Sequence, residues 1–252
     1  MKELTKQIKE KSFHKVYLLT GDEPYLVLQA KHMLKNAMIK EGDTMNYAAF
    51  TDGKIDLNTL QELAFTYPFF SEKRLLLLDG TGILKTGKDE FVSIMENMPE
   101  TTCIIICEPE VDKRSKVYKW IKKNCYVGEF LKKNQTEKVL LRWIAALLGK
   151  EKKQIRENNA RYFLQKTGDD MFQIKNEIDK LIAYAGDREE ITQADIADER
   201  ADETVCGFIG SQFEELDFSQ WNAQFSKWFS EEKKAMEKDH EAFVKEYENL
   251  TR

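Results

Sequence analysis

The sequence predicts an α/β fold in which helices flank a parallel sheet, followed by an all-helical domain and a short helical tail. In the first half of the chain, five segments of strand length alternate with amphipathic segments of helical spacing, an order typical of a parallel sheet. Two of the strands, residues 74–79 and 102–107, are solidly apolar, as are strands that helices cover on both faces. Beyond about Leu131 the strand pattern stops and only helical patterns follow.

The remaining predicted strands are residues 15–20, 45–50 and 125–130, and a helical pattern follows each of the first four strands. In the first helix we expect Asp22 as the N-cap, with Glu23 and Pro24 in the first turn, because a carboxylate satisfies free N–H groups there. The apolar positions that predict the four helices are Leu26, Ala30, Met33, Leu34 and Ala37; Leu57, Leu60, Leu63 and Ala64; Phe91, Ile94, Met95 and Met98; and Val117, Tyr118 and Ile121.

The second half predicts three longer helices and a short fourth one. The longer helices end at Gly149, near Gly168 and at Gly186, because glycine commonly follows the last turn of a helix. Thr192 is the expected N-cap of the short helix, and Asp195 three residues later forms a variant of the capping box. We therefore expect three domains, at residues 1–133, 134–210 and 211–252.

The tail contains aromatic residues that recur at helical spacing and are too apolar to be left in water. We expect them to pack against the last helix of the chain, or alternatively against a partner protein. These residues are Trp221, Phe225, Trp228 and Phe229.

Composition narrows the class of protein. Hydrophobic residues make up 42% and charged residues 33% of the 252 residues, which is typical of a soluble globular protein. No apolar run approaches the roughly 20 residues of a membrane span, and the N-terminus lacks an apolar signal region, so we expect a cytoplasmic protein with no membrane contact. The four cysteines form no C-x-x-C pair and the three histidines are scattered, so no metal or other cofactor is expected.

One segment resembles a phosphate-binding loop. Residues 82–89 read G-x-x-x-x-G-K-D, with a strand before them and a helix after them, but Asp89 stands where a P-loop needs Ser or Thr to hold Mg²⁺. A carboxylate at that position would repel the phosphates. We therefore expect a polar loop, and keep a degenerate P-loop ATPase using Gly82 to Lys88 as an alternative.

The loop after the first strand is the other place where a nucleotide site could lie. It reads GDEPYL, residues 21–26, and one glycine with two carboxylates cannot form an anion-binding nest. The sequence also lacks a G-x-S-x-G elbow and an H-E-x-x-H motif. The residues thus predict no catalytic site.

The order of several motifs resembles the delta subunit of the bacterial DNA polymerase III clamp loader. A strand leads into GDEPYL, then YPFFSEKR (residues 67–74) leads into LLLLDG, and CIIICEPEVDKRSKVYKWI (residues 103–121) follows. The helical stretch KTGDDMFQIKNEIDKLIAYAG (residues 166–186) and the later ITQADI (residues 191–196) resemble the lid domain of that family. The similarity spans roughly residues 13–210.

The resemblance implies an AAA+-like α/β domain, a helical lid and no ATPase activity. It implies a subunit that works with tau/gamma and delta prime, binds the beta sliding clamp, and opens it for loading onto primed DNA during replication. A hydrophobic tip enters a pocket on the clamp, and by position this tip is Tyr67, Phe69 and Phe70. The residues themselves also indicate an exposed tip, because aromatic side chains on a short helix–strand connection do not follow the periodic pattern of buried positions. The other interpretation is that both phenylalanines fold into the core.

The family normally continues into a helical collar domain, in whose place only residues 211–252 follow, so a stand-alone clamp-binding or unloading protein stays an alternative. The net charge of −5 does not indicate nucleic-acid binding by the whole protein. A local, weak DNA contact inside the assembled complex is predicted at a basic cluster, whose other interpretation is a solvated face. The cluster consists of Lys113, Arg114, Lys116, Lys119, Lys122 and Lys123.

Overall fold

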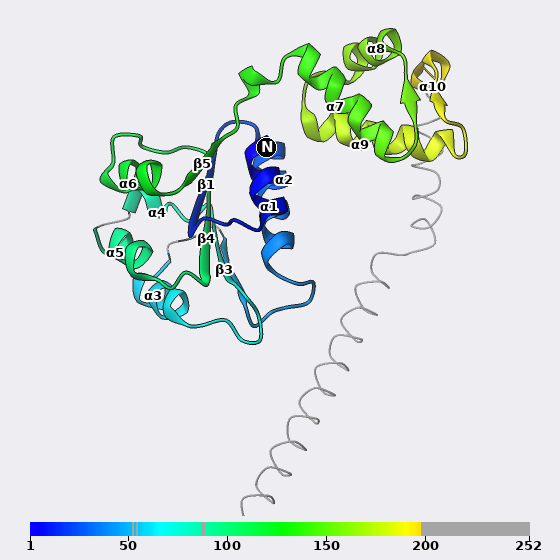
Figure 1. Ribbon diagram of the computed structural model, residues 1–252. Helices are drawn as coiled ribbons and strands as arrows, with labels where there is room; N and C mark the ends of the chain where they lie inside the picture. The colour runs from blue at the N-terminus through cyan, green and yellow to red at the C-terminus, as the bar shows by residue number, and fades with distance from the viewer. Residues whose placement is uncertain (52, 54, 87–88, 198–252) are drawn as a thin grey trace, which may run out of the picture. The chain divides into compact units, whose positions relative to one another are not determined.

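The computed structural model describes residues 1–51, 53, 55–86 and 89–197 (Figure 1). It divides the chain into two compact units, Met1–Leu140 and the residues from Leu141 onward. The predicted aromatic stripe of the tail, Trp221, Phe225, Trp228 and Phe229, lies outside the described residues.

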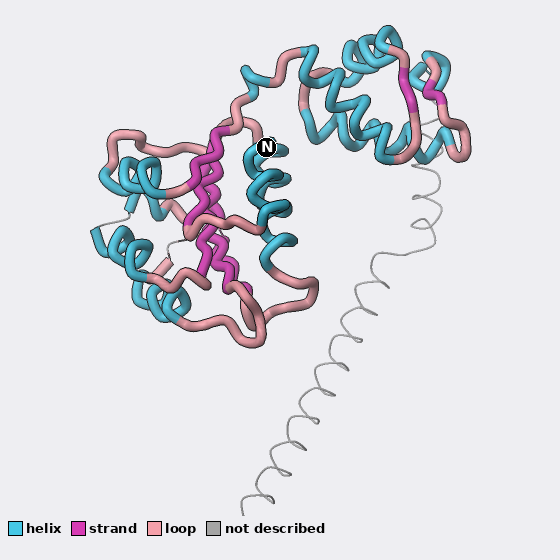
Figure 2. The backbone as a smooth tube through the Cα atoms, viewed as in Figure 1, coloured by secondary structure: helices cyan, strands magenta, loops and turns pink. Residues whose placement is uncertain are grey.

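The first unit contains a five-stranded parallel sheet with the order β2-β3-β4-β1-β5. The predicted α/β fold with a parallel sheet is thus confirmed, and each predicted strand agrees with an observed one within two residues at either end. Figure 2 shows the strands side by side. Their bounds are β1 Val16–Thr20, β2 Tyr47–Thr51, β3 Arg74–Asp79, β4 Thr102–Glu108 and β5 Tyr126–Glu129.

Helices cover both faces of this sheet (Figure 1). The helices α1 Lys2–Glu10 and α2 Pro24–Met38 lie on one face, and α3 Leu57–Phe65, α4 Ile83–Thr86, α5 Asp89–Asn97 and α6 Lys116–Asn124 on the other. Successive side chains of a strand point to opposite faces, so Leu76 and Leu78 enter one core whereas Leu75 and Leu77 enter the other. This two-sided burial explains why β3 and β4 are apolar throughout.

The N-terminus of α2 differs from the prediction. Glu23, not Asp22, is the N-cap, and its carboxylate accepts a hydrogen bond from the backbone N–H of Tyr25 at 3.3 Å. The Asp22 carboxylate instead accepts from the backbone N–H of Lys132 at 2.8 Å. Pro24 at the first helical position moves the helix start one residue along, so the second acidic residue becomes the cap.

The predicted apolar face of α2 is correct at Leu26, Ala30 and Leu34, which pack in one core cluster, but not at its C-terminal end. Ala30 and Leu34 are fully buried, whereas Ala37 is exposed and Met38 is buried in its place. Ala30, Leu34 and Met38 follow one another at intervals of four residues, so they lie on the same face of the helix and pack in one core cluster.

The second unit contains the helical domain and two short strands that the sequence did not predict. Its helices are α7 Glu137–Lys150, which begins just before the unit boundary, α8 Glu157–Thr167, α9 Met171–Ala185 and α10 Gln193–Ala197. The strands β6 Gln154–Ile155 and β7 Glu190–Ile191 pair in parallel, and two residues each are too few to give a strand periodicity. Gly149 lies inside α7 and does not end it.

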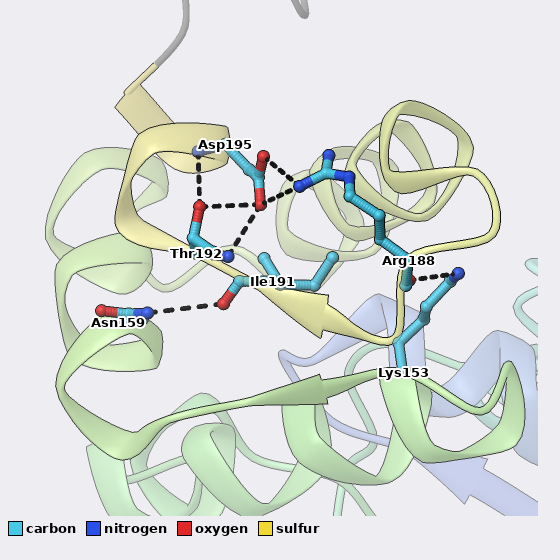
Figure 3. Close-up of polar contacts among 6 residues, drawn as sticks. All are labelled: Lys153, Asn159, Arg188, Ile191, Thr192 and Asp195. Carbon is cyan, nitrogen blue, oxygen red and sulfur yellow. Dashed lines mark hydrogen bonds and ion pairs between the residues drawn. The ribbon is translucent and has the colours of Figure 1, made fainter.

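Side-chain contacts hold the two short strands in place (Figure 3). The buried Lys153, directly before β6, donates to the backbone carbonyls of Gly186 and Arg188, the latter at 2.6 Å. The predicted capping box is confirmed: the Thr192 N–H donates to the Asp195 carboxylate at 2.7 Å, and the Asp195 N–H donates to the Thr192 hydroxyl at 3.3 Å. These bonds join the end of α9, both strands and α10.

No helix among residues 1–51, 53, 55–86 and 89–197 combines the length and the apolar character that a bilayer crossing requires. Within the same part of the chain, no three His, Cys, Asp or Glu side chains gather as metal ligands.

Candidate functional site

Three aromatic side chains project from the connection between α3 and β3. The exposed fractions are 71% for Tyr67, 57% for Phe69 and 92% for Phe70. The expectation that these residues lie outside the core is therefore confirmed. Large aromatic side chains left this exposed are unusual in a monomer, because each keeps apolar surface in water.

Neighbouring segments add further exposed apolar side chains that the sequence did not indicate. Met45, in the loop before β2, is 62% exposed, and Phe65, the last residue of α3, is 39% exposed. Phe65 lies one position beyond the predicted apolar face of α3, which ends at Ala64. Exposed apolar side chains are therefore also present at the end of α3 and in the loop before β2.

The backbone gives Phe70 its outward direction. Its φ angle is +48°, in the left-handed region that non-glycine residues rarely adopt. The rings of Phe69 and Phe70 meet edge to face, with centroids 4.5 Å apart and an angle of 73° between their planes. Such an arrangement is favourable for aromatic pairs, so the two rings form one preassembled apolar knob.

Asn46 holds the base of this knob. Its side chain amide donates to the Phe69 carbonyl at 2.8 Å and accepts from the Phe69 N–H at 2.6 Å. Asn46 is itself only 2% exposed. This contact is not predictable from the sequence, because residues 45–50 were predicted as strand and β2 begins only at Tyr47.

A surface hollow adjoins the aromatic residues. It measures about 630 Å³ and lies between the end of α2 and the α3–β3 connection. Its lining residues are Lys11, Asn36, Ala37, Met38, Ile39, Lys40, Phe70, Ser71 and Glu72. Phe70 therefore stands on the rim of a concave surface that mixes polar and apolar groups.

The segment that resembles a P-loop folds differently from the polar loop that we expected. It contains the short helix α4, and the backbone N–H of Gly82 donates to the Glu108 carboxylate at 2.6 Å. Glu108 is buried as the last residue of β4, and burial raises the pKa of its carboxyl. A carboxylate of the chain itself thus occupies this helix start; residues 87 and 88 lie outside the described part of the chain.

The loop after β1 is closed by the chain itself. Gly21 has a φ of +127°, and a Cβ at this position would come within 1.9 Å of the Phe130 carbonyl oxygen. The Glu23 N–H donates to that same carbonyl at 3.1 Å. This loop therefore packs directly on the end of β5, where a phosphate-binding loop would instead present its N–H groups to a ligand.

The structure does not bring the six predicted basic residues together as one free patch. Lys113 pairs with Glu129 at 2.6 Å, Arg114 with Asp112 at 3.6 Å and Lys116 with Asp89 at 3.5 Å. The other three, Lys119, Lys122 and Lys123, are exposed on α6 and have no ion pair to any residue that the structure describes. The remaining candidate for a DNA contact is this trio.

Known proteins similar to this chain are delta subunits of DNA polymerase III. Residues 17–130 match the family model described as DNA polymerase III, delta subunit. DNA polymerase III subunit delta of Bacillus subtilis (strain 168) is 29% identical over 203 residues, which are 76% of this chain and 58% of that protein. The probable DNA polymerase III subunit delta of Aquifex aeolicus (strain VF5) is 25% identical over 188 residues, 71% of this chain and 52% of that protein.

A solved structure shares the fold. The Bacillus subtilis DNA clamp loader delta protein matches with a TM-score of 0.58 and 24% identity, covering 77% of this chain and 60% of that chain. The chain spans little more than half the length of the two curated relatives.

The five-stranded parallel sheet with flanking helices is an α/β fold, and the Bacillus subtilis clamp loader delta protein shares this fold. Residues 17–130 thus match the family of DNA polymerase III delta subunits, and both curated relatives are described as delta subunits. The resemblance that the sequence motifs indicated is thereby confirmed.

Proposed function

We propose that this chain is a non-catalytic clamp-loader subunit that binds the beta sliding clamp and helps to open it for loading onto primed DNA. The match to the delta-subunit family supports a role in DNA replication. The observation that carries the finer proposal is the exposed aromatic knob formed by Phe69 and Phe70, with Tyr67 beside it. The partners would be the clamp and the other loader subunits, tau/gamma and delta prime.

The knob has the properties of an interface anchor. Binding energy in protein interfaces is concentrated in a few aromatic side chains that fill pockets on the partner. Fully burying one phenylalanine contributes roughly 1.5–3 kcal/mol, so two contribute on the order of 3–6 kcal/mol. The positive φ of Phe70 supports the same function, because strained backbone persists where the surrounding structure holds it for a purpose.

The closed loop after β1 supports a subunit without ATPase activity. A nucleotide would need the N–H groups near the start of α2, but the Glu23 carboxylate and the Phe130 carbonyl already accept from that segment. A phosphate placed there would also meet the negative charge of Glu23. In this proposal the chain contributes binding to the clamp, and ATP hydrolysis belongs to other subunits.

The test is the double variant Phe69→Ala with Phe70→Ala, measured for binding to the purified beta sliding clamp by surface plasmon resonance. We expect the dissociation constant to rise about a hundredfold to ten-thousandfold, as the loss of roughly 3–6 kcal/mol implies. The matched control is Phe172→Ala, which removes a phenylalanine that is 38% exposed on α9 and should leave clamp binding unchanged.

A thermal melt of the same double variant separates binding from folding. Because both side chains are exposed, the midpoint temperature should stay close to that of the wild type. Normal clamp binding by the folded double variant would contradict the proposal. A loss of clamp binding with an unchanged midpoint supports it.

A further inference from the structure

Asn46 is connected to both ends of the segment that carries the aromatic knob. Its side chain makes two hydrogen bonds to the backbone of Phe69, and its own backbone carbonyl accepts from the N–H of Leu75 at 2.8 Å. Leu75 belongs to the strand β3, which lies between β2 and β4, whereas Phe69 belongs to the exposed connection. One residue therefore closes the loop that runs from Phe69 through Phe70 into the sheet.

The two side-chain bonds imitate a pair of strand–strand hydrogen bonds. An amide side chain that donates to a residue's C=O and accepts from its N–H fixes the direction of that peptide segment in the way that a ladder partner does. The register of β2 on β3 begins next to this point, with Tyr47 opposite Leu75. Through its side chain, Asn46 thus fixes the position of Phe69, a residue outside the sheet, relative to the strands β2 and β3.

The orientation of the Asn46 amide is itself determined. Asp43 accepts from the Asn46 side-chain nitrogen at 2.8 Å and from the Asn46 backbone N–H at 3.0 Å. A carboxylate can only accept hydrogen bonds, so it selects the amide rotamer whose oxygen faces the N–H of Phe69. These bonds from Asn46 are the main reason that the pKa of Asp43 is lowered.

We propose that Asn46 is a positioning residue that preorganises Phe69 and Phe70 for docking, with Asp43 setting its orientation. This inference deepens the proposed function, and its binding arm rests on that function. Affinity rises when a docking segment is already held in its bound geometry, because less conformational entropy is lost on binding. The buried Asn46 side chain, which makes two hydrogen bonds to the exposed connection, holds that segment in one geometry before docking.

The first test needs no partner. Amide hydrogen exchange is measured on the full chain as wild type and as Asn46→Ala, with Thr44→Ala as the matched control in the same loop. We expect exchange at the Phe69 amide to accelerate about tenfold or more in Asn46→Ala, because its acceptor is gone. The amide of Ile104 in the central strand reports global unfolding and should exchange as in the wild type.

The second test is a mutant cycle on clamp binding. Asn46→Ala alone should weaken binding to the purified beta clamp by about fivefold to a hundredfold, the range for ordering two docking side chains, those of Phe69 and Phe70, anew. In the background of Phe69→Ala with Phe70→Ala, the same substitution should cost nothing further. A merely structural role would lower binding equally in both backgrounds.

The outcomes are distinguishable. Unchanged exchange at Phe69 in Asn46→Ala overturns the positioning role, whatever the clamp data show. Equal losses in both backgrounds, or no loss in Asn46→Ala when the wild type depends on Phe69 and Phe70, overturn it as well. If instead the Phe69 and Phe70 variant binds normally, the proposed function fails, while the exchange data still decide whether Asn46 orders the loop.

Discussion

The guanidinium of Arg188 donates hydrogen bonds to both carboxylate oxygens of Asp195, at 2.9 and 3.2 Å (Figure 3). The Asp195 side chain is 7% exposed and also accepts from the N–H and hydroxyl of Thr192. Burial disfavours the charged carboxylate, but these hydrogen bonds favour it more, so the pKa of Asp195 is lowered from its ordinary value of 3.8. The start of α10 therefore depends on an ionised carboxylate.

This relationship predicts how stability depends on pH. A carboxyl whose folded-state pKa is lowered stabilises the fold above its ordinary pKa, and that contribution is lost as pH falls through the lower folded value. We expect Asp195→Asn to cost about 1–3 kcal/mol at pH 7, the range for hydrogen bonds to a charged group. Urea denaturation should show the difference from wild type shrinking below about pH 4, near the ordinary carboxyl pKa. A difference that stays constant to pH 3 would show that the charge of Asp195 is not what stabilises the helix start.

The second prediction concerns nucleotides. We expect isothermal titration calorimetry with Mg-ATP or Mg-ADP to show no micromolar site, because the start of α2 is capped by Glu23 and that of α4 faces Glu108. Lys88→Ala, which removes the lysine of the P-loop-like segment, should give the same result as the wild type. A micromolar site that disappears in Lys88→Ala would instead support the degenerate ATPase.

Elements of the fold that leave a periodic or local pattern in the sequence were predictable, and the others were not. The α/β unit was predictable strand by strand because β3 and β4 pack on two cores and contain almost only apolar residues. The capping box of Thr192 and Asp195 was predictable because it is local in sequence. The strands β6 and β7 were not, since pairing over 36 residues through two-residue segments leaves no pattern. The cap of α2 was misplaced because Asp22 and Glu23 are chemically similar neighbours.

The candidate site likewise contains residues that the sequence predicted and residues that it did not. The motif around Tyr67, Phe69 and Phe70 was visible as aromatics on a short connection, and their exposure agrees with that interpretation. Asn46 was not visible, because its partner Phe69 is 23 residues away and the bonds are to backbone atoms that any residue has. The ion pairs within the basic cluster were not visible either, because the carboxylates of Glu129 and Asp89 that pair with Lys113 and Lys116 come from other elements.

The third prediction concerns DNA contact by α6. If Lys119 and Lys122 face the phosphate backbone in the assembled loader, Lys119→Glu with Lys122→Glu should lower the slope of log affinity against log salt by about 2, since each phosphate contact contributes roughly one unit. The control is Lys2→Glu with Lys9→Glu, the same charge change at two exposed positions of α1. Equal slopes for wild type and the α6 variant would show that α6 is a solvated face.

The last prediction tests the closed loop after β1. Gly21→Ala would place a Cβ 1.9 Å from the Phe130 carbonyl oxygen at a φ of +127°, so the strand end, the loop or both must shift. Backbone strain and overpacking each cost about 1–3 kcal/mol, so we expect a loss of about 2–6 kcal/mol in the free energy of unfolding.

Gly149→Ala is the matched control for that substitution. Gly149 lies inside α7 with nothing within 4 Å of an added Cβ, so alanine there should stabilise by about 0.5–1 kcal/mol through its higher helix propensity. Both variants are measured by urea denaturation of the full chain. A Gly21→Ala protein as stable as the wild type would mean that the loop can move away from β5, and the N–H groups at the start of α2 would then be open to a ligand after all.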